Sequence, residues 1–469
     1  MVFSSPTFLY YFLPITMIVY FLVPVPKGSP RLRNLWLLIA SLVFYAWGEP
    51  RYVFLMVAQC VLAWGFSLLI DIYYGQKAAK ALMIVSIVVS FSGLVFFKYA
   101  NFFVTNVNSI AGSSIPLVRL LMPIGISFYT FQLVSYTIDL YRRKIEVQRN
   151  VFDFSTYIAL FPALIAGPIV RYSDIARELG SRVHTWPGFA VGARRFIIGL
   201  GKKMLLANLF GQLVEVYKQS GERSVLFTWI YLLSYALQIY FDFSGYSDMA
   251  IGIGNIFGFK FPENFNYPYI ADSITNFWRR WHMTLSGWFR DYVYIPMGGN
   301  RVKAGRFLIN ILVVWMLTGF WHGADWNYIL WGGYFGIVLL IEKFFLGKVL
   351  GKAPKPIRHI YVILIVFISW AFFDAPGFNE AFAVIGRMFG IGADAFFGRE
   401  AVYYLRSFML PLAIGIVGAT PKIKALAGKV CENKLPATIL EPVVLAVVLI
   451  VSTASMIDGS FNPFIYFRF

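Results

Sequence analysis

The chain alternates between long apolar runs and short polar segments. A helix that crosses about 30 Å of hydrocarbon needs about 20 mostly apolar residues, and about eleven runs approach this length. The pattern therefore predicts an all-α polytopic membrane protein with about eleven transmembrane helices. The expected spans are 8–23, 34–47, 52–70, 81–97, 124–141, 227–243, 307–320, 328–345, 360–373, 402–417 and 439–456.

Proline, glycine or aspartate interrupts the apolar pattern near Pro123, at 159–172 and at 241–258. Backbone that leaves the helix at membrane depth is tolerated only where protein or a water-filled cavity satisfies its polar groups. We therefore expect broken, re-entrant or interfacial helices around a cavity. Asp242 and Asp248 lie on different faces of any straight helix, and we expect them to pair with nearby arginine or lysine. A cation or proton path, as in a secondary transporter, is the alternative.

Composition strengthens the membrane interpretation, since 59% of the residues are hydrophobic and only 14% are charged, against about a quarter charged in soluble domains. We expect one membrane domain over 1–469, with the last span and an external aromatic tail in 435–469. The net charge of +18 falls in short clusters between apolar runs, as in cytoplasmic loops, and this excludes nucleic-acid binding. If the richer clusters of lysine and arginine face the cytoplasm, their order along the first helices predicts an external N-terminus. Cys60 and Cys431 have no metal-site or disulfide spacing.

His322 is the strongest catalytic candidate. It ends an apolar run in LTGFWHGADW, between Gly319 and Gly323 and beside Trp321 and Trp326. Ionisable residues at membrane depth are functional by default, and imidazole transfers protons near neutral pH. A hydrogen-bonded packing role is the alternative.

His282 is a second candidate, within the charged, tryptophan-rich stretch NFWRRWHMTLSGWFRDYVYIPMGGNR (276–301). Arg279 and Arg280 precede it, and Arg290 and Asp291 form an expected ion pair after it. His282 is either a structural residue or a polar group that orients a substrate or His322.

Tyr466 lies fourth from the end, on a short aromatic tail after the last span. The tail is either an interfacial anchor or a means of bringing a phenol into the cavity. In the second case, a base allows its oxygen to attack an activated acyl group.

The two histidine segments, together with LLMPIGISFYTFQLVSYTIDLYR, LIAGPIVRY and YFDFSGYSDMAIGIG, resemble the membrane-bound O-acyltransferase (MBOAT) family. The resemblance is to its bacterial branch of alginate and peptidoglycan O-acetylation membrane subunits. It implies a funnel of tilted helices in the bacterial cytoplasmic membrane, with a thin floor above a cytoplasmic pocket. His322 matches the family's near-invariant histidine, and His282 matches its second recurrent polar position.

The resemblance also implies the reaction. Acetyl-coenzyme A is the expected donor substrate, with no permanently bound cofactor and no metal. His322 acts as the base, and Tyr466 carries the acyl group to a secreted SGNH or esterase-like partner that acetylates a polysaccharide. The expected substrate-binding residues are Trp321, Trp326, Asn327, Arg279, Arg280 and Asp291. Lipid or protein acylation, secondary transport and a structural scaffold are the alternatives.

Overall fold

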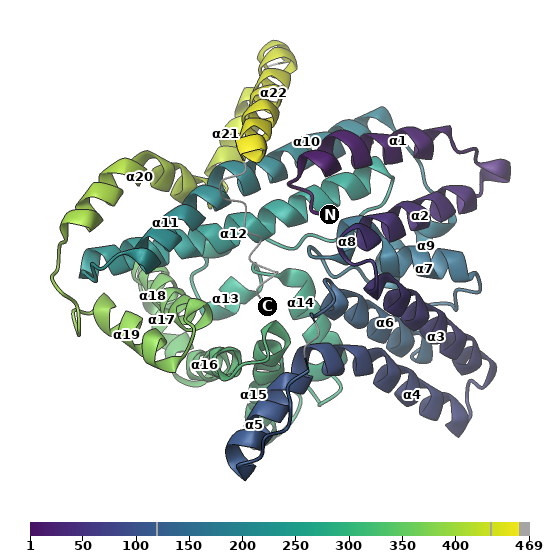
Figure 1. Cartoon of the computed structure of the whole chain (residues 1–469), viewed down its shortest axis with the longest axis horizontal. Coiled ribbons are helices and arrows are strands. Elements are labelled where there is room, and N and C mark those ends of the chain that lie inside the picture. The colour runs from purple at the N-terminus through teal and green to yellow at the C-terminus, as the bar shows by residue number, and fades with distance from the viewer. Residues whose placement is uncertain (119–120, 432–433, 459–469) are drawn as a thin grey trace. The chain divides into compact units, whose positions relative to one another are not determined.

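The computed structural model describes residues 1–118, 121–431 and 434–458, and the secondary structure in these ranges is helical without strands (Figure 1). The all-α prediction is confirmed. Within the described residues, nine uninterrupted helical stretches are long and apolar enough to cross a membrane. They are Tyr52–Ile72, Lys77–Ala111, Trp186–Gln219, Val225–Ile256, Ala304–His322, Trp326–Lys352, Lys355–Asp374, Arg399–Gly418 and Thr438–Asp458.

The predicted number of about eleven spans is not confirmed. The first run forms the shorter apolar helix Phe8–Leu22. Helix α6 (Ile126–Tyr141) has 16 residues and is buried along almost its whole length, as expected for an internal helix. Conversely, Trp186–Gln219 has the length and hydropathy of a span, although no span is predicted there. The basic residues at 194–195 and 202–203 divide its apolar pattern.

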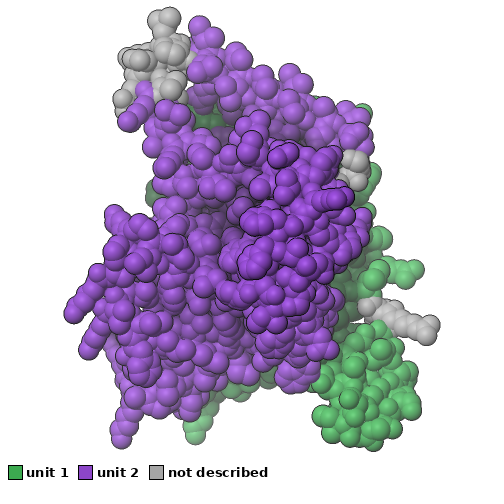
Figure 2. Space-filling model, turned by 90° about the vertical axis from the view of Figure 1, so that its left-hand side faces the viewer, with its two compact units in different colours: residues 1–196, 247–263 green, residues 197–246, 264–469 purple. Residues whose placement is uncertain are grey.

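The chain forms two compact units, coloured separately in Figure 2. Unit 1 comprises 1–196 and 247–263, and unit 2 comprises 197–246 and 264–469. The prediction of one domain stays a prediction. Unit 1 contains η1 (Phe8–Phe12), α1 (Leu13–Leu22), η2 (Pro26–Gly28), α2 (Arg31–Gly48), α3 (Tyr52–Ile72), α4 (Lys77–Leu94), η3 (Val95–Tyr99), α5 (Ala100–Ala111), α6, α7 (Val151–Ala159), α8 (Phe161–Leu164) and α9 (Tyr172–Gly180).

Two long helices contribute to both units: α10 (Trp186–Gly201) and α12 (Val225–Ile256). The remaining helices belong to unit 2. They are η4 (Lys202–Ala207), α11 (Asn208–Gln219), η5 (Pro268–Ile270), α13 (Ile274–Trp278), α14 (Met283–Phe289), η6 (Arg290–Tyr294), α15 (Ala304–His322), α16 (Trp326–Ile341), η7 (Glu342–Leu346), α17 (Gly347–Lys352), α18 (Lys355–Asp374), α19 (Phe378–Met388), α20 (Arg399–Gly418), α21 (Lys422–Cys431) and α22 (Lys434–Asp458).

Two of the predicted interruptions meet inside unit 1. After α7 the chain forms only the single turn α8 and then leaves the helix, and residues 159–170 are buried. Gly125 precedes α6 with φ +77°, a left-handed conformation that glycine adopts without strain. A Cβ there would lie 2.6 Å from the Leu164 carbonyl oxygen. The sequence therefore correctly locates broken backbone at both places, and the segment 159–170 is also buried.

The predicted break at 241–258 is wrong, because α12 continues from Val225 to Ile256. Its glycines permit close helix packing instead of a turn. A Cβ at Gly245 would lie 2.8 Å from the Gly199 carbonyl oxygen, and one at Gly252 would lie 2.6 Å from that of Gly192. These contacts hold α12 against α10.

Both aspartates of α12 pair with cations, as predicted. In unit 2, Lys203 Nζ lies 2.8 Å from Asp242 Oδ1, with the two side chains only 3% and 2% exposed. In unit 1, Arg195 lies 2.9 Å from Asp248 and also pairs with Glu263. The ion pairs explain how charged residues are tolerated in two helices of membrane-spanning length.

Candidate active site

Helices α15 and α16 approach each other backbone to backbone in unit 2, close to the end of α15. A Cβ on Gly319 would collide with the Tyr328 carbonyl oxygen, and one on Gly332 would collide with that of Trp315. Small residues allow such close approach of membrane helices. His322 is the last residue of α15, one turn beyond Gly319.

Aromatic side chains surround His322. Its ring lies edge to face with those of Trp321, Trp331 and Phe373, at centroid distances of 4.9, 5.2 and 5.4 Å. The residue is buried with 7% of its surface exposed. The sequence leads us to expect an imidazole that substrates reach, whereas the structure encloses the His322 ring among aromatic side chains.

His282 precedes α14 and is more deeply buried, with 1% of its surface exposed. Its backbone is left-handed, with φ +42°, a conformation that costs free energy in any residue with a Cβ. Its Nδ1 lies 3.0 Å from Asn264 Oδ1, and the ring contacts Phe243 edge to face at 4.7 Å. Burial, followed by the charge of His322, lowers the pKa of His282 well below its usual value. His282 is therefore neutral at pH 7.

Trp321 joins the two histidines, because its ring contacts His282 at 6.0 Å as well as His322. The two best catalytic candidates from the sequence, 40 residues apart, thus belong to one aromatic cluster. Two imidazoles in one buried cluster are suited to proton transfer.

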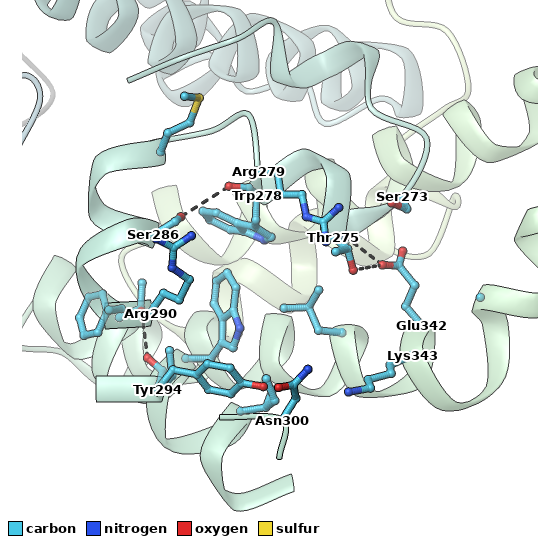
Figure 3. A pocket seen from close by; sticks show the side chains of 18 of the residues that line it. Ser273, Thr275, Trp278, Arg279, Ser286, Arg290, Tyr294, Asn300, Glu342 and Lys343 are labelled. Atoms are coloured by element: carbon cyan, nitrogen blue, oxygen red, sulfur yellow. Dashed lines mark hydrogen bonds between the residues drawn. The ribbon is translucent and has the colours of Figure 1, made fainter. Parts of the chain in front are cut away.

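A cavity of about 1110 Å³ lies beside this cluster, entirely within unit 2. This volume slightly exceeds the usual range of ligand sites, about 300–1,000 Å³. Figure 3 shows Arg290 and Tyr294 on one side of the cavity and Glu342 and Lys343 on the other. Four cations and two carboxylates line it, which gives a positive lining: Arg279, Arg290, Lys343 and Arg358, with Asp272 and Glu342.

One face of α15 forms a continuous wall of this cavity. Phe307, Ile311, Val314 and Thr318 line it at spacings of four, three and four residues, which places them on one helix face. The wall extends about 17 Å at 1.5 Å per residue. Trp321 and His322, three and four residues after Thr318, lie on either side of the continuation of this face. The wall of the cavity ends at Thr318, one helical turn before His322, and neither His322 nor His282 lines the cavity.

Glu342 fixes the opposite wall. Its carboxylate is 4% exposed and accepts hydrogen bonds from the Ile274 and Thr275 backbone N–H groups and from the Thr275 hydroxyl, at 2.6–2.9 Å. A carboxylate at a helix start offsets the helix dipole and satisfies its first N–H groups. Glu342 thereby anchors α13, the helix that leads to the His282 segment.

The other predicted binding residues have different positions. Arg279 lines the cavity. Arg280 instead donates to Asn276 Oδ1 and to the Asn266 carbonyl, at 2.9 and 3.1 Å, and so braces the loop before α13. Asp291 forms the predicted ion pair with Arg290, at 2.7 Å.

Of the residues after His322, Trp326 is half exposed. Asn327 is buried and donates from its side chain to the Ala375 carbonyl at 3.0 Å. Tyr466 lies outside the described residues. Within the described ranges, no group of three or more His, Cys, Asp or Glu residues is arranged to hold a metal ion.

Asn264 and Glu342 are the site residues that sequence reasoning missed. Asn264 lies in the polar run PENFN (262–266), and its composition resembles that of any loop. Glu342 has a better signal, since it is an acidic residue directly after the apolar run 328–341.

Comparison with known proteins identifies relatives of this chain. A probable alginate O-acetylase, AlgI, of Azotobacter vinelandii is 41% identical over 397 residues, covering 84% of this chain and 79% of the relative. A second, of Pseudomonas putida, is 36% identical over 492 residues and covers all of both chains. A peptidoglycan O-acetyltransferase of Helicobacter pylori is 34% identical over 422 residues, covering 83% of this chain and 80% of the relative.

The family model of MBOAT, the membrane-bound O-acyltransferase family, matches residues 53–379. This range contains both histidines, the cavity and most of the candidate spans. The protein is therefore a multi-pass membrane O-acyltransferase, and the chain belongs to the MBOAT family.

Proposed function

We propose that the protein takes an acetyl group from cytoplasmic acetyl-coenzyme A and passes it across the bacterial cytoplasmic membrane for O-acetylation of an extracytoplasmic polysaccharide. Relatives named for alginate and peptidoglycan O-acetylation support this acceptor class. The observation that carries the proposal is the positive cavity whose α15 wall ends at Thr318, one helical turn before His322. No resident cofactor is required, since the thioester is already activated.

The distribution of charge orients the cavity. Basic residues gather where α15 begins, where α17 ends and where α18 begins: Arg301, Lys303, Arg306, Lys352 and Lys355. Under the positive-inside rule this end faces the cytoplasm. His322, at the other end of α15, then lies toward the external side. We propose, as the sequence predicts, that the N-terminus and the C-terminal tail are external.

The cavity lining suits a coenzyme thioester. Arg279, Arg290 and Lys343 attract its phosphates, since guanidinium and ammonium groups bind phosphate by charge and hydrogen bonding. Ile311 and Val314 offer an apolar wall to the arm that carries the acyl group. The thioester carbonyl then arrives beside Thr318 and His322.

His322 acts as the general base. Its neutral imidazole accepts the proton of an attacking hydroxyl while the hydroxyl oxygen forms a bond to the thioester carbonyl carbon. Collapse of the tetrahedral intermediate breaks the C–S bond, and the leaving thiolate takes the proton from the imidazolium. Closely packed rings exclude water, so hydrolysis of the thioester is suppressed.

Tyr466 is the proposed attacking hydroxyl. A phenol with a pKa of about 10 loses its proton more readily than a sugar alcohol. The aryl ester that forms retains much of the thioester's transfer potential. A secreted SGNH or esterase-like partner then passes the acetyl group to the polysaccharide without a further energy source.

The test supplies radiolabelled acetyl-coenzyme A to the cytoplasmic face of membrane vesicles that contain the protein. We expect label on the protein or the polymer with the native chain and none with His322→Ala, at equal abundance in the membrane. Normal labelling in the variant would remove the assigned base. Ion-driven solute uptake without acyl transfer would favour a transporter.

A further inference from the structure

We infer that Asn264 is a positioning residue that fixes the tautomer of His282 and leaves its Nε2 as a hydrogen-bond acceptor for a substrate. The inference deepens the proposed acyl transfer and rests on it. It is carried by the contacts between the loop before η5 and the start of α14, all within unit 2.

The orientation of the Asn264 amide follows from its neighbours. The Thr284 backbone N–H, which is only a donor, points to Asn264 Oδ1 at 3.4 Å, and the Thr284 hydroxyl donates to the same atom at 2.9 Å. The atom that faces Thr284 is therefore the carbonyl oxygen rather than the amide nitrogen. The Asn264 backbone carbonyl also accepts from Met283 N–H at 2.9 Å, so the loop is held in register.

This orientation determines the proton on His282. Because Asn264 Oδ1 is an acceptor, the Nδ1 atom 3.0 Å away must carry the hydrogen. A neutral imidazole has one N–H, so Nε2 has a lone pair and no proton. His282 is thus prepared to accept at Nε2 and not to donate there.

Nε2 is buried and has no hydrogen-bond partner among the described residues. The surrounding rings are Phe243 of α12, Phe265 of the loop and Trp321 of α15, at centroid distances of 4.7, 6.4 and 6.0 Å. A buried acceptor without a donor costs about 1–3 kcal/mol, and the left-handed backbone of His282 adds strain. Both the unpaired acceptor and the strained backbone belong to one residue, His282, in the aromatic cluster that holds His322. Such a concentration of unfavourable free energy is expected of a site prepared for a ligand.

The ligand group is an N–H donor of the bound coenzyme, since its pantetheine arm carries two amides. The attacking hydroxyl has a single proton, which His322 takes, so it has none to donate to Nε2. His282 holds that donor at Nε2 while His322 takes the hydroxyl proton. Protonation of His282 would remove the acceptor. The titratable group that affects it from the packed elements is His322.

The test compares Asn264→Ala and Asn264→Asp in the full-length protein, by following thiol release from acetyl-coenzyme A between pH 5 and 9. Asn264→Ala loses the acceptor for Nδ1–H, and we expect kcat/KM to fall at least about tenfold. Asn264→Asp keeps an acceptor oxygen and adds a negative charge that favours imidazolium. We expect it to retain activity at high pH, with the acidic limb of the profile moved up by about 1 unit or more.

Asn266→Asp is the matched control, since Asn266 is exposed in the same loop. It introduces the same charge without facing His282, so its profile should coincide with that of the native chain. Titration of acetyl-coenzyme A tests whether Nε2 holds the coenzyme, because the KM for acetyl-coenzyme A should then rise in Asn264→Ala. An unshifted profile in Asn264→Asp, or native kinetics in Asn264→Ala, would overturn the inference. A native protein that releases no thiol would instead refute the proposed donor.

Discussion

The Lys203–Asp242 pair permits a quantitative prediction. At 2.8 Å, the attraction is about 6 kcal/mol for an effective dielectric constant of about 20, and both side chains are almost fully buried. Removing one partner leaves a buried charge, which costs about 3–5 kcal/mol. We therefore expect Lys203→Met and Asp242→Leu each to lower the free energy of unfolding by about 3–5 kcal/mol. The double variant, with two apolar side chains, should lie close to the native protein.

The free energies of unfolding of the native protein, the two single variants and the double variant form a double-mutant cycle. They are measured by unfolding with sodium dodecyl sulfate in bicelles, followed by tryptophan fluorescence. The coupling free energy should reach about 3 kcal/mol or more. Asp248→Asn is the control, since the Arg195–Asp248 side chains are 25% and 17% exposed, and its cost should be smaller. If the double variant lost as much free energy of unfolding as the two single variants together, Lys203 and Asp242 would not be a coupled buried pair.

Three further predictions concern the helix contact, the cavity wall and the tail. Gly319→Ala should lower the free energy of unfolding by about 1–3 kcal/mol, because the added Cβ meets the Tyr328 carbonyl oxygen. Gly333→Ala, which has open space around it, should leave the free energy of unfolding unchanged. Equal melting temperatures of the two variants would contradict this expectation. Glu342→Gln should lower the free energy of unfolding by about 1.5–3 kcal/mol and also lower acyl transfer, because the Glu342 carboxylate accepts hydrogen bonds from three donors at the start of α13. Native stability together with native activity would show that Glu342 does not anchor α13. Tyr466→Phe keeps the aromatic ring and loses the nucleophilic oxygen, so labelling by acetyl-coenzyme A should stop at unchanged membrane abundance; full activity would reduce the tail to an anchor.

The sequence predicts those features that depend on apolar length and on residue type. The apolar runs identify most of the spanning helices but not Trp186–Gln219, and the breaks near Pro123 and at 159–172 follow from proline and glycine. The two histidines stand out because ionisable groups are rare in this composition, and the structure brings both to Trp321.

The features that the sequence does not reveal depend on partners distant along the chain. From the sequence alone, Gly245 predicts a break in the helix. The structure shows instead that its missing side chain allows α12 to pack against the Gly199 backbone. Likewise, Lys203 disrupts an apolar pattern, and only the fold supplies Asp242 as its counterion. Asn264 has no local signature, since its role depends on a histidine 18 residues further on.

The discontinuity of unit 1 has a consequence for biogenesis. Its last segment, 247–263, is synthesised some 50 residues after 196, yet it supplies both carboxylates that neutralise Arg195. A nascent chain that ends between these points holds an arginine within an apolar helix without its counterions. We therefore expect insertion of the first half to be completed only after Glu263 has been synthesised. Split versions of the protein should assemble only if the amino-terminal fragment includes 247–263.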